Sequence, residues 1–201
     1  MCGAKDPRWS GTERPWNDPF RDVRTSDWFY SGVKFAYQHG LFQGTAADTF
    51  SPDEPMTRAM LVTVLWRMDG KPSAAGGSSF TDVPRGQWYT EAVAWAAENG
   101  VVNGVGGGKF EPDGNVTREQ IATILYRYAG LRGVPTGGRA DLGSFPDGGA
   151  VSGWAYDALS WANAAGLIAG TREGGVDYLA PQQNATRAQV AVILMRYLGA
   201  A

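Results

Sequence analysis

One pattern of residues occurs three times along this chain of 201 residues. Each copy begins with Phe-x-Asp, continues through a tryptophan and two glycines, and ends with Thr-Arg in front of an apolar stretch. In the first two copies the offset is constant, because Phe20 and Phe80, like Thr57 and Thr117, lie 60 positions apart. A short repeat cannot bury its apolar faces alone, so we expect the three copies to pack against one another.

The repeats also divide the chain into segments. Residues 1–19 form an N-terminal extension, and the stretches between copies are rich in Gly, Pro and Ser, which is typical of linkers. The three copies span residues 20–70, 80–130 and 145–199. We expect them to form one domain.

Each copy is predicted to form two helices joined by a loop. The first starts near a tryptophan and ends at a glycine in the C′ position, at Gly40, Gly100 and Gly166. The second follows a threonine N-cap and carries apolar residues at i, i+3, i+4 and i+7. These residues are Leu61, Val64, Leu65 and Met68; Ile121, Ile124, Leu125 and Tyr128; and Val190, Ile193, Leu194 and Tyr197. The sequence therefore predicts an all-α fold with three helix-loop-helix units about a pseudo-threefold axis.

An arginine follows each threonine cap, at Arg58, Arg118 and Arg187. The first turn carries the positive end of the helix dipole, so a cation there is disfavoured by roughly 0.3–1 kcal/mol when exposed. A surface salt bridge is one explanation, but it is a weak reason for the same placement three times. We therefore favour ligand binding. A second set, Arg67, Arg127 and Arg196, is expected in the last turn, where the dipole favours a cation.

Three further sets of residues are candidates for the same site, and each also has a structural interpretation. Trp28, Trp88 and Trp154 either fill the core or offer a stacking surface for a sugar. Asp22, Asp82 and Asp147 either cap a turn or contact a ligand, or do both. Gly44, Gly104 and Gly170 either supply a positive φ or let backbone amides approach a ligand.

The combination of residues indicates what kind of ligand is expected. An arginine beside the free amides of a helix N-terminus suits a carboxylate or phosphate, and a neighbouring tryptophan suits a sugar. An acidic carbohydrate is therefore predicted. Paired carboxylates do not recur in the copies, and Cys2 and His39 are the only residues of their types, so we expect no catalytic residues, no metal site and no cofactor.

Composition excludes other classes of partner. The net charge of −2 offers no electrostatic case for nucleic acid, and no segment approaches the ~20 apolar residues that span a bilayer. The first 19 residues lack the apolar core of a signal peptide. The protein is then either cytosolic or a fragment of a larger exported chain.

The combined motif "F-x-D-V…W-[FY]…A…G-[LV]…G…F-x-P-D…[MV]-T-R" resembles the S-layer homology (SLH) domain, in three tandem copies over residues 20–199. The resemblance implies a three-pronged spindle around a central three-helix bundle. It also implies non-catalytic anchoring of a larger exported protein at the bacterial cell surface. The implied partner is a secondary cell wall polysaccharide with pyruvylated N-acetylmannosamine, bound in grooves between repeats. By the same resemblance, the motif arginines meet the pyruvate carboxylate and the candidate aspartates, tryptophans and loop glycines line the groove.

The third copy departs from this pattern, because Ala155 replaces an aromatic residue and its loop is longer. We therefore expect the groove built around Arg187 to bind least well. A self-assembling S-layer protein, whose repeats mainly contact other protein subunits, is the alternative function.

Overall fold

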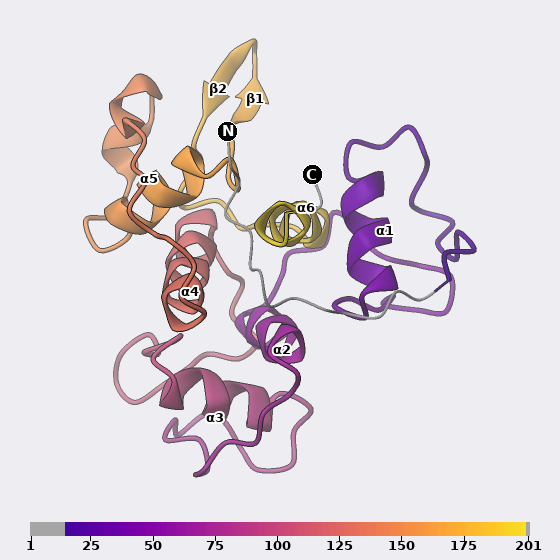
Figure 1. Ribbon diagram of the computed structural model, residues 1–201, viewed down its shortest axis with the longest axis vertical. Coiled ribbons are helices and arrows are strands. Elements are labelled where there is room, and N and C mark those ends of the chain that lie inside the picture. The colour runs from indigo at the N-terminus through magenta and orange to yellow at the C-terminus, as the bar shows by residue number, and fades with distance from the viewer. Residues whose placement is uncertain (1–14, 200–201) are drawn as a thin grey trace.

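The computed structural model describes residues 15–199, which are mostly helical (Figure 1). Each copy supplies two helices within this range. These are α1 (Tyr30–Gln38) and α2 (Arg58–Met68), α3 (Thr90–Glu98) and α4 (Arg118–Leu131), and α5 (Tyr156–Ala164) and α6 (Arg187–Tyr197). Two short 3-10 helices, Leu142–Ser144 and Gly148–Ala150, precede α5.

The second helix of each copy begins where the sequence predicts. The side chain of Thr57 accepts a hydrogen bond from the amide of Met60, and Thr117 and Thr186 accept from Gln120 and Gln189 in the same way. The two glutamines also accept from the cap amide, which completes a capping box in α4 and α6. Methionine cannot do this in α2.

The first helices end as predicted, each at a glycine with positive φ. After α1, the amide of Gly40 donates to Tyr37 and the amide of Leu41 donates to Ala36, both at 2.9 Å. This is the Schellman arrangement, in which a left-handed residue satisfies the last carbonyls of a helix. Gly100 and Gly166 repeat it after α3 and α5.

One helix end differs from the prediction. Helix α4 continues through Gly130 to Leu131, so Arg127 lies before the last turn. The physical reason is the position of the left-handed glycine, which is Gly133 with a φ of 69° after α4 but Gly70 with a φ of 80° after α2.

The helices pack across copies. Helix α3 of the second copy packs on α2 of the first, α5 of the third packs on α4 of the second, and α1 of the first packs on α6 of the third. Figure 1 shows α2, α4 and α6 in the middle of the molecule, with α1, α3 and α5 outside them. Each first helix therefore rests on the second helix of the preceding copy, and α1 closes the series on α6.

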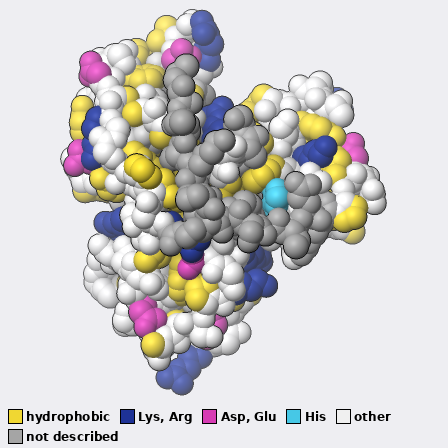
Figure 2. Space-filling model, viewed as in Figure 1, with side chains coloured by type: hydrophobic (Ala, Val, Ile, Leu, Met, Phe, Trp, Pro, Cys, Tyr) yellow, Lys and Arg dark blue, Asp and Glu magenta, His cyan; other side chains and the backbone are white. Residues whose placement is uncertain are grey.

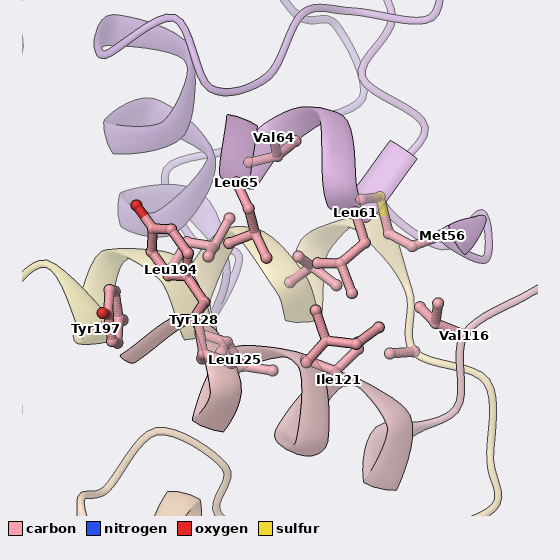
Figure 3. Packing of buried hydrophobic residues seen from close by; sticks show 14 of the residues in the cluster. Met56, Leu61, Val64, Leu65, Val116, Ile121, Leu125, Tyr128, Leu194 and Tyr197 are labelled. Carbon is pink, nitrogen blue, oxygen red and sulfur yellow. The ribbon is translucent and has the colours of Figure 1, made fainter. Parts of the chain in front are cut away.

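A ring of backbone hydrogen bonds joins the segments just before the three second helices. The amide of Met56 donates to Ala185, that of Ala185 donates to Val116, and that of Val116 donates to Met56, each at 2.9 Å. Next to this ring, the predicted apolar faces of α2, α4 and α6 are buried in one cluster (Figure 3). Tyr128 and Tyr197 close its far end, with ring centroids 6.0 Å apart.

An antiparallel hairpin corrects the all-α prediction. Strands β1 (Thr171–Glu173) and β2 (Val176–Tyr178) lie in the long loop of the third copy. Gly174 and Gly175 connect them with φ values of 56° and 86°, and two consecutive positive φ values are what a tight type I′ hairpin turn requires. The shorter loops of the other copies form only single bridges, Ala46 to Thr49 and Gly106 to Lys109.

The N-terminal extension is described only from residue 15 onward, so most of that predicted segment, with Cys2 and Trp9, lies outside the described residues. Trp16 packs on the first copy. Its indole N–H donates to the hydroxyl of Tyr30 at 3.0 Å, and its ring contacts Phe20 and Tyr37 edge-on. Within the described range, none of the helices has the length and apolar character needed to cross a membrane.

Candidate functional site

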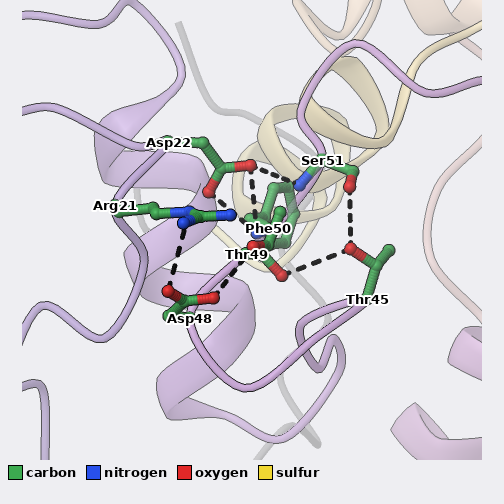
Figure 4. Close-up of polar contacts among 7 residues, drawn as sticks. All are labelled: Arg21, Asp22, Thr45, Asp48, Thr49, Phe50 and Ser51. Carbon is green, nitrogen blue, oxygen red and sulfur yellow. Dashed lines mark hydrogen bonds and ion pairs between the residues drawn. The ribbon is translucent and has the colours of Figure 1, made fainter.

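A carboxylate organises the loop between the two helices of each copy. In the first copy, Asp22 accepts hydrogen bonds from the amides of Phe50 and Ser51, at 2.8 and 2.7 Å (Figure 4). Ser51 has a φ of 57°, a left-handed conformation that costs a non-glycine residue about 1–3 kcal/mol unless its surroundings hold it. The two bonds to Asp22 supply that restraint. Asp22 therefore has a structural role, but it restrains the distant loop at Phe50 and Ser51 and not the turn directly after Phe-x-Asp, as the sequence predicted.

The other two copies repeat this arrangement. Asp82 accepts from the amides of Phe110 and Glu111, and Asp147 accepts from those of Leu179 and Ala180. Burial alone raises the pKa of Asp82, but hydrogen bonds from backbone amides, those of Phe110 and Glu111 first, together with the charge of Lys109 outweigh it, so that the net pKa lies below its ordinary value. The charged form of this carboxylate is therefore the one that the fold stabilises.

Each motif arginine fastens its own copy to the loop of the next. The Nε of Arg58 donates to the carbonyl of Phe110 at 2.7 Å, Arg118 donates to Leu179 at 2.8 Å, and Arg187 donates to Phe50 at 2.8 Å. All three arginines are only 5–6% exposed. A surface salt bridge therefore does not explain them. The unfavourable helix position is offset by charge-assisted hydrogen bonds between copies, each contributing about 1.5–3 kcal/mol.

The three guanidinium groups differ in how many of their donors are occupied. Arg118 also donates its Nη2 to the carbonyl of Ala169 at 2.7 Å, and Arg187 donates its Nη2 to that of Gln43 at 2.8 Å. Arg58 has no such second bond within the described part of the chain. Its guanidinium therefore keeps the most donors for a ligand.

Burial is the main influence on the pKa of these arginines. It lowers the pKa of Arg58, while the nearby carboxylates of Glu111 and Asp82 act in the opposite direction. For Arg118, burial likewise lowers the pKa and Asp147 opposes it. The loop aspartates therefore lie close enough to partner the charge electrostatically while their oxygens accept backbone amides.

The helix N-termini are not free anion sites, which corrects one part of the sequence interpretation. The amide of Arg58 donates to the carbonyl of Gly114, and the next amide, that of Ala59, donates to Pro112. Helices α4 and α6 are met in the same way by carbonyls of the third and first copies. The loop of the neighbouring copy has thus taken the amides that a ligand would otherwise use.

The three tryptophans are exposed, so their interpretation as core residues is wrong. Trp28 is 66% exposed, Trp88 57% and Trp154 60%. In the first two copies the following aromatic residue supports the indole edge-on, with ring centroids 5.4 Å apart for Trp28 and Phe29. Ala155 follows Trp154 and gives no such support. Large exposed indoles, two of them propped by a neighbouring ring, suit stacking on a ligand.

The loop glycines are explained mainly by close packing. A Cβ on Gly104 would lie 2.7 Å from Cε1 of Phe80, and one on Gly170 would lie 3.0 Å from Cε1 of Phe145. A Cβ on Gly44 would meet the carbonyl of Ala46 and the ring of Phe20. Of the three, Gly104 has a positive φ, at 75°. The positive-φ interpretation therefore holds for the second copy.

Three grooves bring the motif arginines, the tryptophans and the loop glycines together, and each groove takes residues from all three copies. The candidate aspartates are not among the residues that line these grooves. The Arg58 groove also contains Gly104 and Arg127 from the second copy and Trp154 from the third. The Arg118 groove contains Gly170 and Arg196 from the third copy and Trp28 from the first. The Arg187 groove contains Gly44 and Arg67 from the first copy and Trp88 from the second.

This composition corrects the premise behind the expected ranking of grooves. The long loop of the third copy borders the Arg118 groove, and Trp154, which precedes Ala155, borders the Arg58 groove. The Arg187 groove instead has Met60 where the other two have Gln120 and Gln189. Its cavity volume is about 170 Å³, against 380 Å³ for the Arg58 groove and 540 Å³ for the Arg118 groove.

Sequence reasoning missed one set of groove residues. Arg67, Arg127 and Arg196 were explained by the helix dipole, yet each lines a groove beside a motif arginine of another copy. Arg67 and Arg196 also donate to the carbonyls of Leu41 and Leu167. Their recurrence ten residues after each threonine was the signal available in the sequence.

The described residues give little support for other chemistry. Among them, no cluster of His, Cys, Asp and Glu side chains could hold a metal ion. On the face drawn in Figure 2, Lys and Arg side chains are scattered and do not form a continuous stripe. The arrangement in the grooves, an exposed indole with two guanidinium groups, is suited to holding an acidic sugar.

A family model described as the S-layer homology domain matches residues 19–59, 79–122 and 144–191. This chain belongs to the S-layer homology domain family. The three matched segments contain all of the candidate aspartates, tryptophans, loop glycines and motif arginines.

Relatives with this SLH region include enzymes and surface-layer proteins. An endoglucanase of Bacillus sp. (strain KSM-635) is 31% identical over 180 residues, which is 90% of this chain and 19% of the enzyme. The surface-layer 125 kDa protein of Lysinibacillus sphaericus is 32% identical over 173 residues, which is 86% of this chain and 14% of that protein. This chain thus spans less than a fifth of either relative.

Proposed function

We propose that this SLH chain is a non-catalytic module that holds a larger protein on the bacterial cell surface by binding an acidic secondary cell wall polysaccharide. The proposed epitope is pyruvylated N-acetylmannosamine. The observation that carries the proposal is the threefold recurrence of one groove, in which an exposed tryptophan and two arginines from three different copies converge. Such a groove offers a flat apolar surface and a fixed positive charge, as a sugar acid requires.

Different roles follow for the candidate residues. The tryptophans stack on the sugar ring, and the remaining guanidinium donors of both arginine sets meet the carboxylate. The loop glycines allow the backbone to lie close under the ligand. Asp22, Asp82 and Asp147 position the loop, since their oxygens already accept two backbone amides each.

We also propose that the module has the three-pronged spindle shape that the resemblance implies. Its support is the cyclic packing of α1 on α6, α3 on α2 and α5 on α4, together with the backbone ring through Met56, Val116 and Ala185. Membership of a larger exported protein is supported by the two relatives, in which the matched region is a small part of the whole.

Calorimetry tests the ligand. The methyl glycoside of pyruvylated N-acetylmannosamine should bind, and the same glycoside without pyruvate should bind at least tenfold more weakly. Trp88→Ala should weaken binding at the Arg187 groove, one site of the three, by roughly two- to tenfold, which corresponds to a stacking contribution of about 0.5–1.5 kcal/mol. The matched control is Tyr156→Ala, because Tyr156 is 44% exposed and is absent from the residues lining the three grooves. Equal binding of the two glycosides would refute the proposal.

Self-assembly is the second candidate function, and the surface-layer relatives favour it. Purified protein that forms sheets without any cell wall material, and that does not sediment with polymer-bearing walls, would support this alternative.

A further inference from the structure

The Arg118 groove differs from the other two because the β1–β2 hairpin borders it. The hairpin contributes Thr171 and Arg172 to the lining, beside Arg118 and Arg196. Three arginines therefore line this groove, whereas the Arg58 and Arg187 grooves each have two. In this groove, as in the other two, the lining residues include no Asp or Glu.

Arg172 is available to a ligand. Its side chain is 72% exposed, and its described ion pair is with Asp177 across the hairpin, at 3.9 Å, with Asp177 itself 55% exposed. An ion pair at this distance in water contributes little and can be exchanged for a ligand anion at small cost. Arg118, in contrast, is fixed by its bonds to Leu179 and Ala169. The groove thus combines a rigid cation at its base with an adaptable one at its rim.

The Arg118 groove is also large enough for a ligand that contacts both Arg118 and Arg172. Its cavity volume of 540 Å³ lies within the ~300–1,000 Å³ typical of ligand sites, while that of the Arg187 groove is 170 Å³. A planar guanidinium binds one carboxylate or phosphate in bidentate fashion, so a second, separately mounted guanidinium suits a second acidic group.

We propose that the Arg118 groove recognises a glycan segment with two separate acidic groups. Arg118 and Arg196 meet the first group, and Arg172 on the hairpin meets the second. This inference rests on the proposed function and adds that one of the three grooves differs from the others in its ligand.

Three ligands test it by calorimetry. The first is the methyl glycoside of pyruvylated N-acetylmannosamine, with one acid; the second carries an added glucuronic acid; and the third carries an added glucose, which matches the second in size but lacks its carboxylate. The full chain is compared with Arg172→Ala and with Arg21→Ala as the matched control. Arg21 is similarly exposed at 74% and similarly paired, with Asp48 at 3.6 Å in the first copy (Figure 4).

The unaltered chain should bind the glucuronic acid ligand about three- to tenfold more tightly than the glucose ligand, at one site in three. Arg172→Ala should abolish this preference, and Arg21→Ala should keep it. Absence of the preference in the unaltered chain, or its persistence in Arg172→Ala, would overturn this inference and leave the proposed function intact. Failure of all three ligands to bind would overturn both.

Discussion

Arg187 and Arg58 allow one hydrogen bond between copies to be measured by difference. Both are 6% exposed, both donate Nε to the carbonyl of a phenylalanine, and both hold the guanidinium over that phenylalanine ring, at 4.7 and 4.8 Å. Arg187 alone of the two adds a bond from Nη2 to the carbonyl of Gln43. Replacing each with alanine should remove the shared interactions equally, so that they cancel in the comparison.

Two interactions remain in the difference, the bond to Gln43 and the contact of the Arg187 guanidinium with the ring of Phe42. A hydrogen bond from a charged donor contributes about 1.5–3 kcal/mol, so Arg187→Ala should lower the free energy of unfolding by that much more than Arg58→Ala. The ring of Phe42, 5.4 Å from the Arg187 guanidinium, adds in the same direction. Equilibrium unfolding in urea, without ligand, measures the difference as a shift in midpoint at unchanged slope. A difference in the free energy of unfolding below about 0.5 kcal/mol, or one of opposite sign, would refute the idea that the Nη2 bond stabilises the contact between copies.

Three further outcomes are expected. Gly32→Ala should lower the free energy of unfolding, measured in urea, by about 1–3 kcal/mol, because the added Cβ would lie 2.6 Å from Cγ2 and 2.9 Å from the backbone of Val192. Gly130→Ala, in α4 with open space around it, should instead raise the free energy of unfolding by about 0.5–1 kcal/mol. Changes of the same sign in the two variants would contradict this packing. Trp16→Ala should lower the melting temperature, whereas an unchanged melt would show that its contacts with Phe20 and Tyr37 contribute nothing. The pKa of Asp82 is lowered in the folded state, so its contribution to the free energy of unfolding is complete above about pH 4 and is lost as the pH falls through the folded pKa. Asp82→Asn should therefore make the free energy of unfolding fall less steeply as the solution is acidified. An unchanged dependence on pH in the acidic range would count against this role of Asp82.

The local features of the fold were predictable because they depend on residues close in sequence. The Thr117 cap with Gln120, and the Schellman ending at Gly100, need only a few neighbouring residues. The hairpin was also signalled, since Gly174 and Gly175 between short runs containing Thr, Val and Tyr are typical of a two-residue turn.

The arrangement between copies was not predictable, for a reason that lies in the repetition itself. When three copies carry the same residue types, the pattern cannot say whether α2 packs on the first helix of its own copy or of the next. Only the packing reveals that α2 takes α3, and that Arg58 therefore meets Phe110. The exposure of Trp28 was undecidable for a different reason, because a tryptophan at a helix start suits an interior or a groove equally.

The contact between α1 and α6 makes this tandem repeat a closed set. In an open solenoid every added unit finds the same free edge, and the two end units need polar caps. Here the third copy uses the loop and first helix of the first copy as its partner, so within residues 15–199 the edge that a fourth copy would need is already covered. Loss of any one copy would break two seams at once and leave a matching pair of uncovered surfaces. Such a truncated chain should therefore unfold or exchange a copy with a second molecule.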